Sequence, residues 1–234
     1  MVRIAFFVEG LTEQLFLEKL LLEVFGNKDI AVNVKKIKGG TSIPIAISEI
    51  SSMEVTEETK YYVLIFDCGG DSNVKSYILD QRNSLLKTGY SKIIGIRDVY
   101  PDFERHEIHD LIYGLKYQLP QKDLPTKFVL SVMEIEAWFL AEETHYKRID
   151  EKLTMEYIEE NIGFNPSTYN TELRDAPSND LNQIYGLVGK EYVKEKTSLE
   201  TTVNALDYGS IYFDVNTRIT SLKELIDEIN QIFV

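Results

Sequence analysis

The sequence predicts an α/β protein with a mainly parallel central sheet flanked by helices, followed by a mostly helical C-terminal extension. Two observations predict this class. Continuous apolar runs alternate with amphipathic stretches over the first part of the chain, as strands alternate with helices in parallel sheets. Further along, apolar positions follow helical spacing, and no repeat or low-complexity linker intervenes. We expect an α/β core over residues 1–142 and a helical extension over 143–234, packed on the core as one compact unit.

The strands are predicted from short apolar runs. Residues 4–8 and 61–66 are apolar or aromatic throughout, which is typical of strands buried on both faces. Weaker strand patterns cover residues 31–37, 93–96 and 128–132. Because helical stretches separate most of these runs, we expect right-handed crossovers and parallel pairing.

The helices are predicted from apolar side chains spaced three and four residues apart. Such stripes cover residues 11–25, 72–86 and 104–119. A further helix is expected after the turn at Gly39-Gly40, through Ile50. Near the C-terminus, Ser221 and Glu224 predict a capping box at the start of a last amphipathic helix.

Composition narrows the functional classes. Of 234 residues 44% are hydrophobic, enough for a core, and the net charge is −13. That charge argues against coating nucleic acid through a global field, although a local site with metal ions or a partner would suffice. A single cysteine suits a reducing cytoplasm. The first residues do not resemble a signal peptide, and no apolar run is long enough to predict a membrane span.

Several catalytic motifs are absent from the sequence. We find no Walker A motif, no Gly-x-Gly-x-x-Gly after a strand and no Gly-x-Ser-x-Gly elbow. His106 and His109 are one residue too close for a zincin motif, which makes a zinc-histidine enzyme improbable. Cys68 is expected to be a small buried side chain rather than a nucleophile.

Carboxylates at strand ends are the remaining signal for chemistry. Glu9, Asp67 and Asp98 each stand at or just after the end of a predicted strand. In open parallel sheets these ends form the ligand crevice, and clustered carboxylates there suit Mg²⁺ or Mn²⁺ as one or two ions. For Asp98, and for Asp71 nearby, an ordinary turn or helix-cap role is an equally good interpretation.

Two short motifs stand at predicted strand ends. Residues 7–13 (FVEGLTE) place a Glu before a Gly directly after a strand, and residues 67–71 (DCGGD) place two Asp residues around a Gly pair. They resemble the opening motif and a stretched Asp-x-Asp motif of TOPRIM domains, which occur in topoisomerases, primases and OLD-family nucleases. The resemblance implies Glu9 as general base or metal ligand, and Asp67 and Asp71 as metal ligands, with Glu9 and Asp67 catalytic.

Four further strings follow along the chain: Gly39-Gly40, residues 134–141 (EIEAWFLA), 176–178 (APS) and 192–196 (YVKEK). They are similar, in matching order, to a TOPRIM-like bacterial family, domain of unknown function 4276. That family is often encoded beside AAA- or ABC-type ATPases in presumed anti-phage cassettes. The resemblance covers nearly the whole chain and implies that Glu134 and Glu136 contribute to the same metal pocket.

Local geometry leaves alternatives open for three of these acidic residues. Glu134 and Glu136 share a face if they lie in a strand, but they diverge by about 200° if a helix has already begun. Glu13 could join the metal shell or simply favour the start of its helix. Trp138 is expected to anchor the core rather than to stack on a base.

Basic residues supply candidate phosphate contacts. Lys38 leads into Gly39 and Gly40, whose backbone N–H groups could cradle an anion. Lys194 and Lys196 could hold a phosphate backbone. In each case, ordinary solvation of a charged surface is the competing interpretation.

The preferred hypothesis is a metal-dependent phosphodiesterase, a DNA or RNA nuclease of a bacterial defence complex, in which Glu9 accepts a proton from the attacking water. An inactive TOPRIM-shaped interaction or regulatory subunit of an ATPase complex is the alternative. A nucleotidyl- or phosphotransferase ranks last because no nucleotide cradle is visible. A nucleic-acid substrate, an ATPase partner and a homo-oligomer are all compatible with the sequence.

Overall fold

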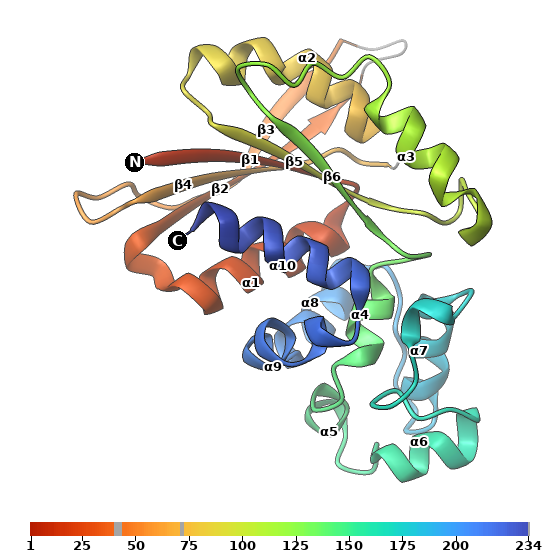
Figure 1. Ribbon diagram of the computed structural model, residues 1–234. Coiled ribbons are helices and arrows are strands. Elements are labelled where there is room, and N and C mark those ends of the chain that lie inside the picture. The colour runs from red at the N-terminus through yellow and green to blue at the C-terminus, as the bar shows by residue number, and fades with distance from the viewer. Residues whose placement is uncertain (40–43, 71–72, 234) are drawn as a thin grey trace. The chain divides into compact units, whose positions relative to one another are not determined.

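The computed structural model describes residues 1–39, 44–70 and 73–233 (Figure 1). The chain divides into two compact units, which we call unit 1 (residues 1–98 and 102–130) and unit 2 (residues 99–101 and 131–234). Unit 2 therefore begins at Ser131, ahead of the expected boundary at residue 143. Gly40 and Asp71, both predicted site residues, lie outside the described residues.

A six-stranded sheet with the order β3-β2-β4-β1-β5-β6 forms the centre of unit 1. β1 is parallel to both β4 and β5, and β2 is parallel to β4, whereas β3 runs antiparallel to β2. The predicted α/β class with a mainly parallel sheet is confirmed. The strands are β1 (Val2–Val8), β2 (Ile30–Lys38), β3 (Ala46–Ser52), β4 (Tyr61–Asp67), β5 (Lys92–Asp98) and β6 (Thr126–Ser131).

Helices cover both faces of this sheet. α1 (Leu11–Asp29) lies on one face, and α2 (Asn73–Lys87) and α3 (Ile108–Lys116) lie on the other (Figure 1). The α2 face is packed with apolar side chains such as Phe7 and Phe66, whose rings stack at 4.6 Å. The connections after β1 and β4 thus leave toward opposite faces, which makes the carboxyl ends of these neighbouring strands a topological switch point.

Unit 2 is mostly helical, as expected for the C-terminal part of the chain. The side chain of Trp138 is fully buried there, and its ring N–H donates a 2.8 Å hydrogen bond to Ser221 Oγ, so its predicted core role is confirmed. The α-helices of unit 2 are α4 (Glu136–Ala141), α5 (His145–Ile149), α6 (Met155–Ile162), α7 (Pro177–Gly186), α8 (Lys196–Ala205), α9 (Tyr208–Phe213) and α10 (Thr220–Ile232). Short 3₁₀ turns are η1 (Arg105–Glu107) in unit 1, and η2 (Thr171–Leu173) and η3 (Val215–Thr217) in unit 2.

Two local predictions are wrong. The helix expected through Ile50 is instead the edge strand β3, where β-branched Ile47 and Ile50 favour extended backbone and β2 offers a partner. The capping box of Ser221 and Glu224 is also absent. Glu172 accepts hydrogen bonds from the backbone N–H groups of Thr220 and Ser221 at the start of α10. Ser221 Oγ instead accepts the hydrogen bond of the Trp138 ring N–H.

Within residues 1–39, 44–70 and 73–233, no helix combines the length and the apolar composition needed to cross a bilayer.

Candidate functional site

The carboxyl ends of β4, β1 and β5 place three of the predicted acidic residues in unit 1 on neighbouring strands. Asp67 is the last residue of β4 and Asp98 the last of β5, while Glu9 directly follows β1 between them. Asp67 and Asp98 are each only 2% exposed, and Glu9 is half-buried. The topology thus delivers carboxyl groups from distant parts of the sequence to one edge of the sheet.

Hydrogen bonds tie the residue after β1 to both neighbouring strand ends. The Glu9 side chain accepts a bond of 3.0 Å at Oε2 from the backbone N–H of Asp98. The Glu9 carbonyl accepts a bond of 2.8 Å from the N–H of Gly70, in the loop after β4. Glu9 is therefore held in place by the end of β5 on one side and by the loop after β4 on the other.

Asp67 already has a cationic partner. Lys36 Nζ lies 2.5 Å from Asp67 Oδ2, and the backbone N–H of Gly69 donates to Oδ1 at 2.9 Å. Lys36 reaches this position because it is aligned with Asp67 in the parallel pairing of β2 and β4. Sequence reasoning missed the pair, since its only local signal is a lysine in a largely apolar strand.

Glu13 makes the contact expected of a helix start. Its buried carboxylate accepts a 2.8 Å bond at Oε2 from the N–H of Gly10, the residue before α1. A carboxylate here interacts favourably with the positive end of the helix dipole. This contact supports the electrostatic interpretation of Glu13, and its assignment to a metal shell stays a prediction.

The donor atoms at this edge suit a hard cation in chemistry, but a ready-made ligand set is not formed. Carboxylate oxygens are the ligands that Mg²⁺ and Mn²⁺ prefer. Within residues 1–39, 44–70 and 73–233, no three His, Cys, Asp or Glu side chains are grouped so that they could hold a metal ion. A cation at Asp67 would have to compete with the Lys36 ammonium.

Unit 2 contains a pair of buried carboxylates around one lysine. Lys194 Nζ lies 3.4 Å from Glu134 Oε1 and 3.4 Å from Glu136 Oε1. Glu134 also accepts bonds from the N–H and the hydroxyl of Ser178, at 2.9 and 3.0 Å. Tyr192 donates its hydroxyl to Glu136 Oε1 at 2.7 Å. Three of the strings that carry the family resemblance, 134–141, 176–178 and 192–196, therefore contact one another at this pair.

The strand-or-helix question for Glu134 and Glu136 is settled by the backbone. β6 ends at Ser131, and α4 begins at Glu136. The helix has therefore not begun at Glu134, so the divergence expected within a helix does not apply, and both carboxylates contact Lys194. Glu134 precedes the helix, next to Met133 with its positive φ of 66°, and is not bound by helical spacing.

Glu136 is an unusual carboxyl group in electrostatic terms. It is fully buried, and burial raises its pKa, as does nearby Glu134, while Lys194 and Tyr192 act in the opposite direction. Its Oε2 atom has no hydrogen-bond partner among the described residues. A carboxylate in this position needs a partner or a proton to offset its lost hydration.

The predicted phosphate contacts divide into exposed and engaged groups. Lys38 is exposed, and Gly39, at φ 93°, uses its carbonyl to accept a 2.6 Å bond from the hydroxyl of Tyr77. Lys194 contacts the carboxylate pair described above. Lys196 lies 3.6 Å from Glu200, one turn along α8. All remain predictions as phosphate ligands.

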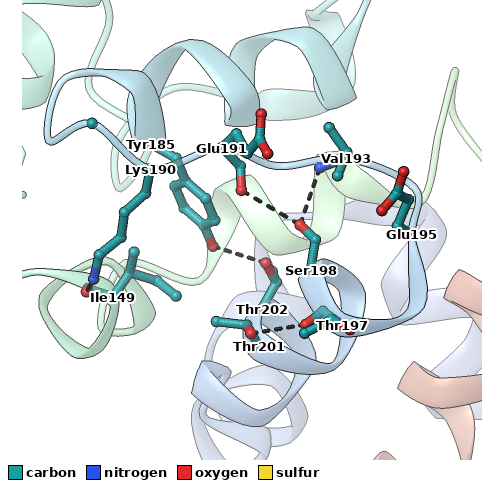
Figure 2. A pocket seen from close by; sticks show the side chains of 11 residues that line it. Ile149, Tyr185, Lys190, Glu191, Val193, Glu195, Thr197, Ser198, Thr201 and Thr202 are labelled. Carbon is teal, nitrogen blue, oxygen red and sulfur yellow. Dashed lines mark hydrogen bonds between the residues drawn. The ribbon is translucent and has the colours of Figure 1, made fainter.

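A cavity of about 550 Å³ in unit 2 was not foreseen (Figure 2). Its polar lining includes Tyr185, whose hydroxyl donates to Thr202 Oγ1 at 3.2 Å, and Ser198, which bonds the backbone of residues 191 and 193. Lys190 donates to the carbonyl of Ile149. None of the predicted catalytic carboxylates lines this cavity.

Comparisons with known proteins add little about function. No protein-family model matches the chain, and no curated protein matches it. A solved hypothetical protein from Pyrococcus horikoshii OT3 is 14% identical with a TM-score of 0.47, covering 98% of this chain and 100% of that one. A second structure, from Lactobacillus plantarum WCFS1, carries the provisional name of a cell surface hydrolase. It is 10% identical, with a TM-score of 0.34 and coverage of 99% and 90%. At these scores neither similarity bears on activity.

Proposed function

We propose that the protein is a Mg²⁺- or Mn²⁺-dependent phosphodiesterase, a nuclease of TOPRIM type that serves an ATPase-associated bacterial anti-phage system. One observation carries this proposal. Glu9 lies between Asp67 and Asp98 at the carboxyl ends of three adjacent strands, at a switch point of the sheet. Open α/β sheets bind their ligands at such points.

The residues at this edge would take different roles in the reaction. A bound divalent ion would supply a Lewis acid for a phosphoryl oxygen and would lower the pKa of an attacking water. Glu9, oriented by the N–H of Asp98, accepts the proton of that water. Asp67 contributes oxygen ligands, and Lys36, displaced from it, remains beside the site as a cation for the substrate phosphate.

The charge of the chain indicates how substrate is bound. With a net charge of −13, the protein has few cations to neutralise a nucleic-acid backbone, so affinity depends on a local site. Lys38 beside the end of β2 is one exposed cation available for this purpose. An AAA- or ABC-type ATPase partner in the cytoplasm would supply the remaining affinity for DNA or RNA.

Two substitutions that preserve shape test the catalytic assignment. Glu9→Gln and Asp67→Asn should each lower Mn²⁺-dependent cleavage of DNA or RNA by roughly 10²-fold or more, while circular dichroism and thermal unfolding show a folded chain. Glu23→Gln is the matched control, because Glu23 on α1 is exposed and its ion pair is with Lys19, one turn back on the same helix. Full cleavage by either site variant would refute the proposal.

One observation favours the alternative, an inactive interaction or regulatory subunit of an ATPase complex. The charge of Asp67 is already balanced by Lys36, whose ammonium lies 2.5 Å away, so a metal ion is not needed to offset it. Calorimetric titration with Mn²⁺ separates the two functions. Loss of binding on Glu9→Gln supports the nuclease, whereas no Mn²⁺ binding to the purified wild-type chain at millimolar concentration supports the interaction subunit.

A further inference from the structure

A cavity of about 490 Å³ lies in unit 1, on the face of the sheet that α2 covers. Its apolar and aromatic lining comes from β4, from α2 and from the segment between α2 and β5, and consists mainly of Tyr62, Leu64, Phe66, Leu85 and Tyr90. Small-molecule sites are typically cavities of about 300–1,000 Å³ with mainly apolar walls and a few polar groups. The cavity therefore has the size and the walls of a small-molecule site.

The charged residues that line this cavity are cationic, although the chain as a whole carries a net charge of −13. They are Arg3 and Lys35, both half-buried, and no Asp or Glu of the described ranges is among the lining residues. The Arg3 guanidinium carbon lies 5.7 Å from the centre of the Tyr62 ring, and its Nη1 donates a 2.9 Å hydrogen bond to the Thr88 carbonyl. These contacts orient the guanidinium without neutralising its charge.

Neither cation is balanced by a nearby carboxylate. Within residues 1–39, 44–70 and 73–233, Arg3 and Lys35 form no ion pair. Glu49 stands opposite Lys35 in the pairing of β2 and β3, but it accepts a 3.1 Å hydrogen bond from Asn33 Nδ2 instead. A cleft lined by charges of one sign concentrates ligands of the opposite sign, so this cavity favours an anion.

The side chain of Tyr90 supplies an independent observation. Tyr90 lines the cavity and is only 8% exposed, yet its hydroxyl forms no hydrogen bond with the part of the chain that the structure describes. Burial raises the pKa of Tyr90, so the hydroxyl stays protonated and keeps its capacity to donate. Buried tyrosine hydroxyls usually have a partner, which a bound ligand would provide here.

We propose that this cavity binds a small aromatic anion, a planar ring that carries a carboxylate or a phosphate. The ring packs against the aromatic and apolar lining, and Arg3 and Lys35 attract the anionic group. Arg3 and Tyr62 lie at the amino ends of β1 and β4, whereas Glu9 and Asp67 lie at the carboxyl ends. The inference therefore does not rest on the proposed nuclease.

The experiment titrates the full chain with two fluorescent probes of similar shape. One is 8-anilinonaphthalene-1-sulfonate, an aromatic anion, and the other is N-phenyl-1-naphthylamine, which has the same rings without the sulfonate. Combining Arg3→Met with Lys35→Met should weaken binding of the anion at least about tenfold and leave the uncharged probe within about twofold. The matched control combines Lys19→Met with Lys28→Met, which removes the same charge from α1 on the other face and should change neither affinity.

A steric substitution locates the probes. Ser84 is an exposed residue of α2 that lines the cavity, so Ser84→Trp should fill the space without disturbing the core and should weaken both probes at least about tenfold. Gln81→Trp, also from the lining of α2, repeats the test. Asn83→Trp is the control, because Asn83 is exposed on the same helix and does not line the cavity. Circular dichroism and thermal unfolding check that each variant is folded.

Competition then tests the charge of the ligand. Both 1-naphthoate and 1-naphthyl phosphate should displace the anionic probe, and their relative strength distinguishes a carboxylate ligand from a phosphate ligand. The cation 1-naphthylmethylamine should not displace it. Four outcomes would each overturn the inference: no binding of the anionic probe to the wild-type chain, unchanged binding in the folded Trp variants, equal losses of both probes when the two cations are removed, or displacement by the amine as strong as by the acids.

Discussion

The backbone N–H of Asp98 donates a 3.0 Å hydrogen bond to Oε2 of Glu9, which joins the ends of the neighbouring strands β5 and β1. The bond gives Asp98 a role that does not depend on its own side chain. A carboxylate that accepts a backbone N–H is fixed in orientation. The end of β5 thus positions the residue that we propose as the general base.

Lys36→Met should destabilise the protein because it leaves the buried Asp67 carboxylate without its cation. The free energy of unfolding should fall by about 1–3 kcal/mol in metal-free buffer. Mn²⁺ should restore part of the loss if it binds Asp67. Urea unfolding with chelator and with Mn²⁺ measures both effects. Lys60→Met removes the exposed pair with Asp29 and should change stability much less, and equal losses in the two variants would contradict our interpretation.

Lys38→Ala should weaken nucleic-acid binding in a salt-dependent way. If Lys38 contacts one phosphate, the slope of log affinity against log salt concentration should fall by about 0.7–0.9. Lys196→Ala should have a smaller effect, because Glu200 lies 3.6 Å from that ammonium. Fluorescence anisotropy with labelled single-stranded and duplex DNA over a salt series measures the slopes. An unchanged slope in Lys38→Ala would remove this residue from the interface.

Gly95→Ala should destabilise unit 1 through a steric clash. A Cβ atom at this position of β5 would lie 2.7 Å from the ring of Phe128 and 3.1 Å from Ile78. Overpacking of this kind lowers the free energy of unfolding by about 1–3 kcal/mol. Adding Phe128→Leu should recover part of the loss. Gly186→Ala, where a Cβ meets nothing within 4 Å, is the control, and a comparable loss there would argue against the clash.

His145 should make the protein less stable in mild acid. Burial lowers its pKa to about 4 from 6.5, and its Nδ1 lies 2.5 Å from the Glu142 carbonyl oxygen. The unfolded chain binds a proton below pH 6.5, whereas the folded chain binds none until about pH 4. Stability therefore decreases as pH falls through this window, by about 3 kcal/mol in all.

His145→Asn tests this assignment, because the Asn side chain can still donate to the Glu142 carbonyl but does not titrate. The free energy of unfolding, measured by urea at several pH values between 4 and 7, should depend less steeply on pH in the variant. An identical pH dependence in the two proteins would show that other groups cause it.

The elements that could be predicted from the sequence are those whose own residues carry the signal, without knowledge of their neighbours in the fold. The strand ending at Asp67 was predictable because its apolar run is continuous and needs no knowledge of its neighbours. β3 was missed because it is an exposed edge strand, stabilised by pairing with β2 rather than by a buried pattern of its own. The placement of acidic residues at the sheet edge followed from parallel topology alone.

The ion pairs at the candidate sites could not be predicted from the sequence, for the same reason. Lys36 and Asp67 are 31 residues apart, and Lys194 and Glu134 are 60 apart. Each pair depends on strand order or on helix packing, which residue spacing does not encode. The carboxylates could be nominated from sequence, but the lysines that already neutralise them could not.

Residues 191–195 alternate in what they touch. Glu191, Val193 and Glu195 line the cavity of Figure 2, whereas Tyr192 and Lys194 contact Glu136. A movement that withdraws Lys194 from its carboxylates would shift the intervening cavity wall. A small molecule in the cavity and the contacts of Lys194 with its carboxylates would then influence each other by the same factor, because thermodynamic linkage is reciprocal.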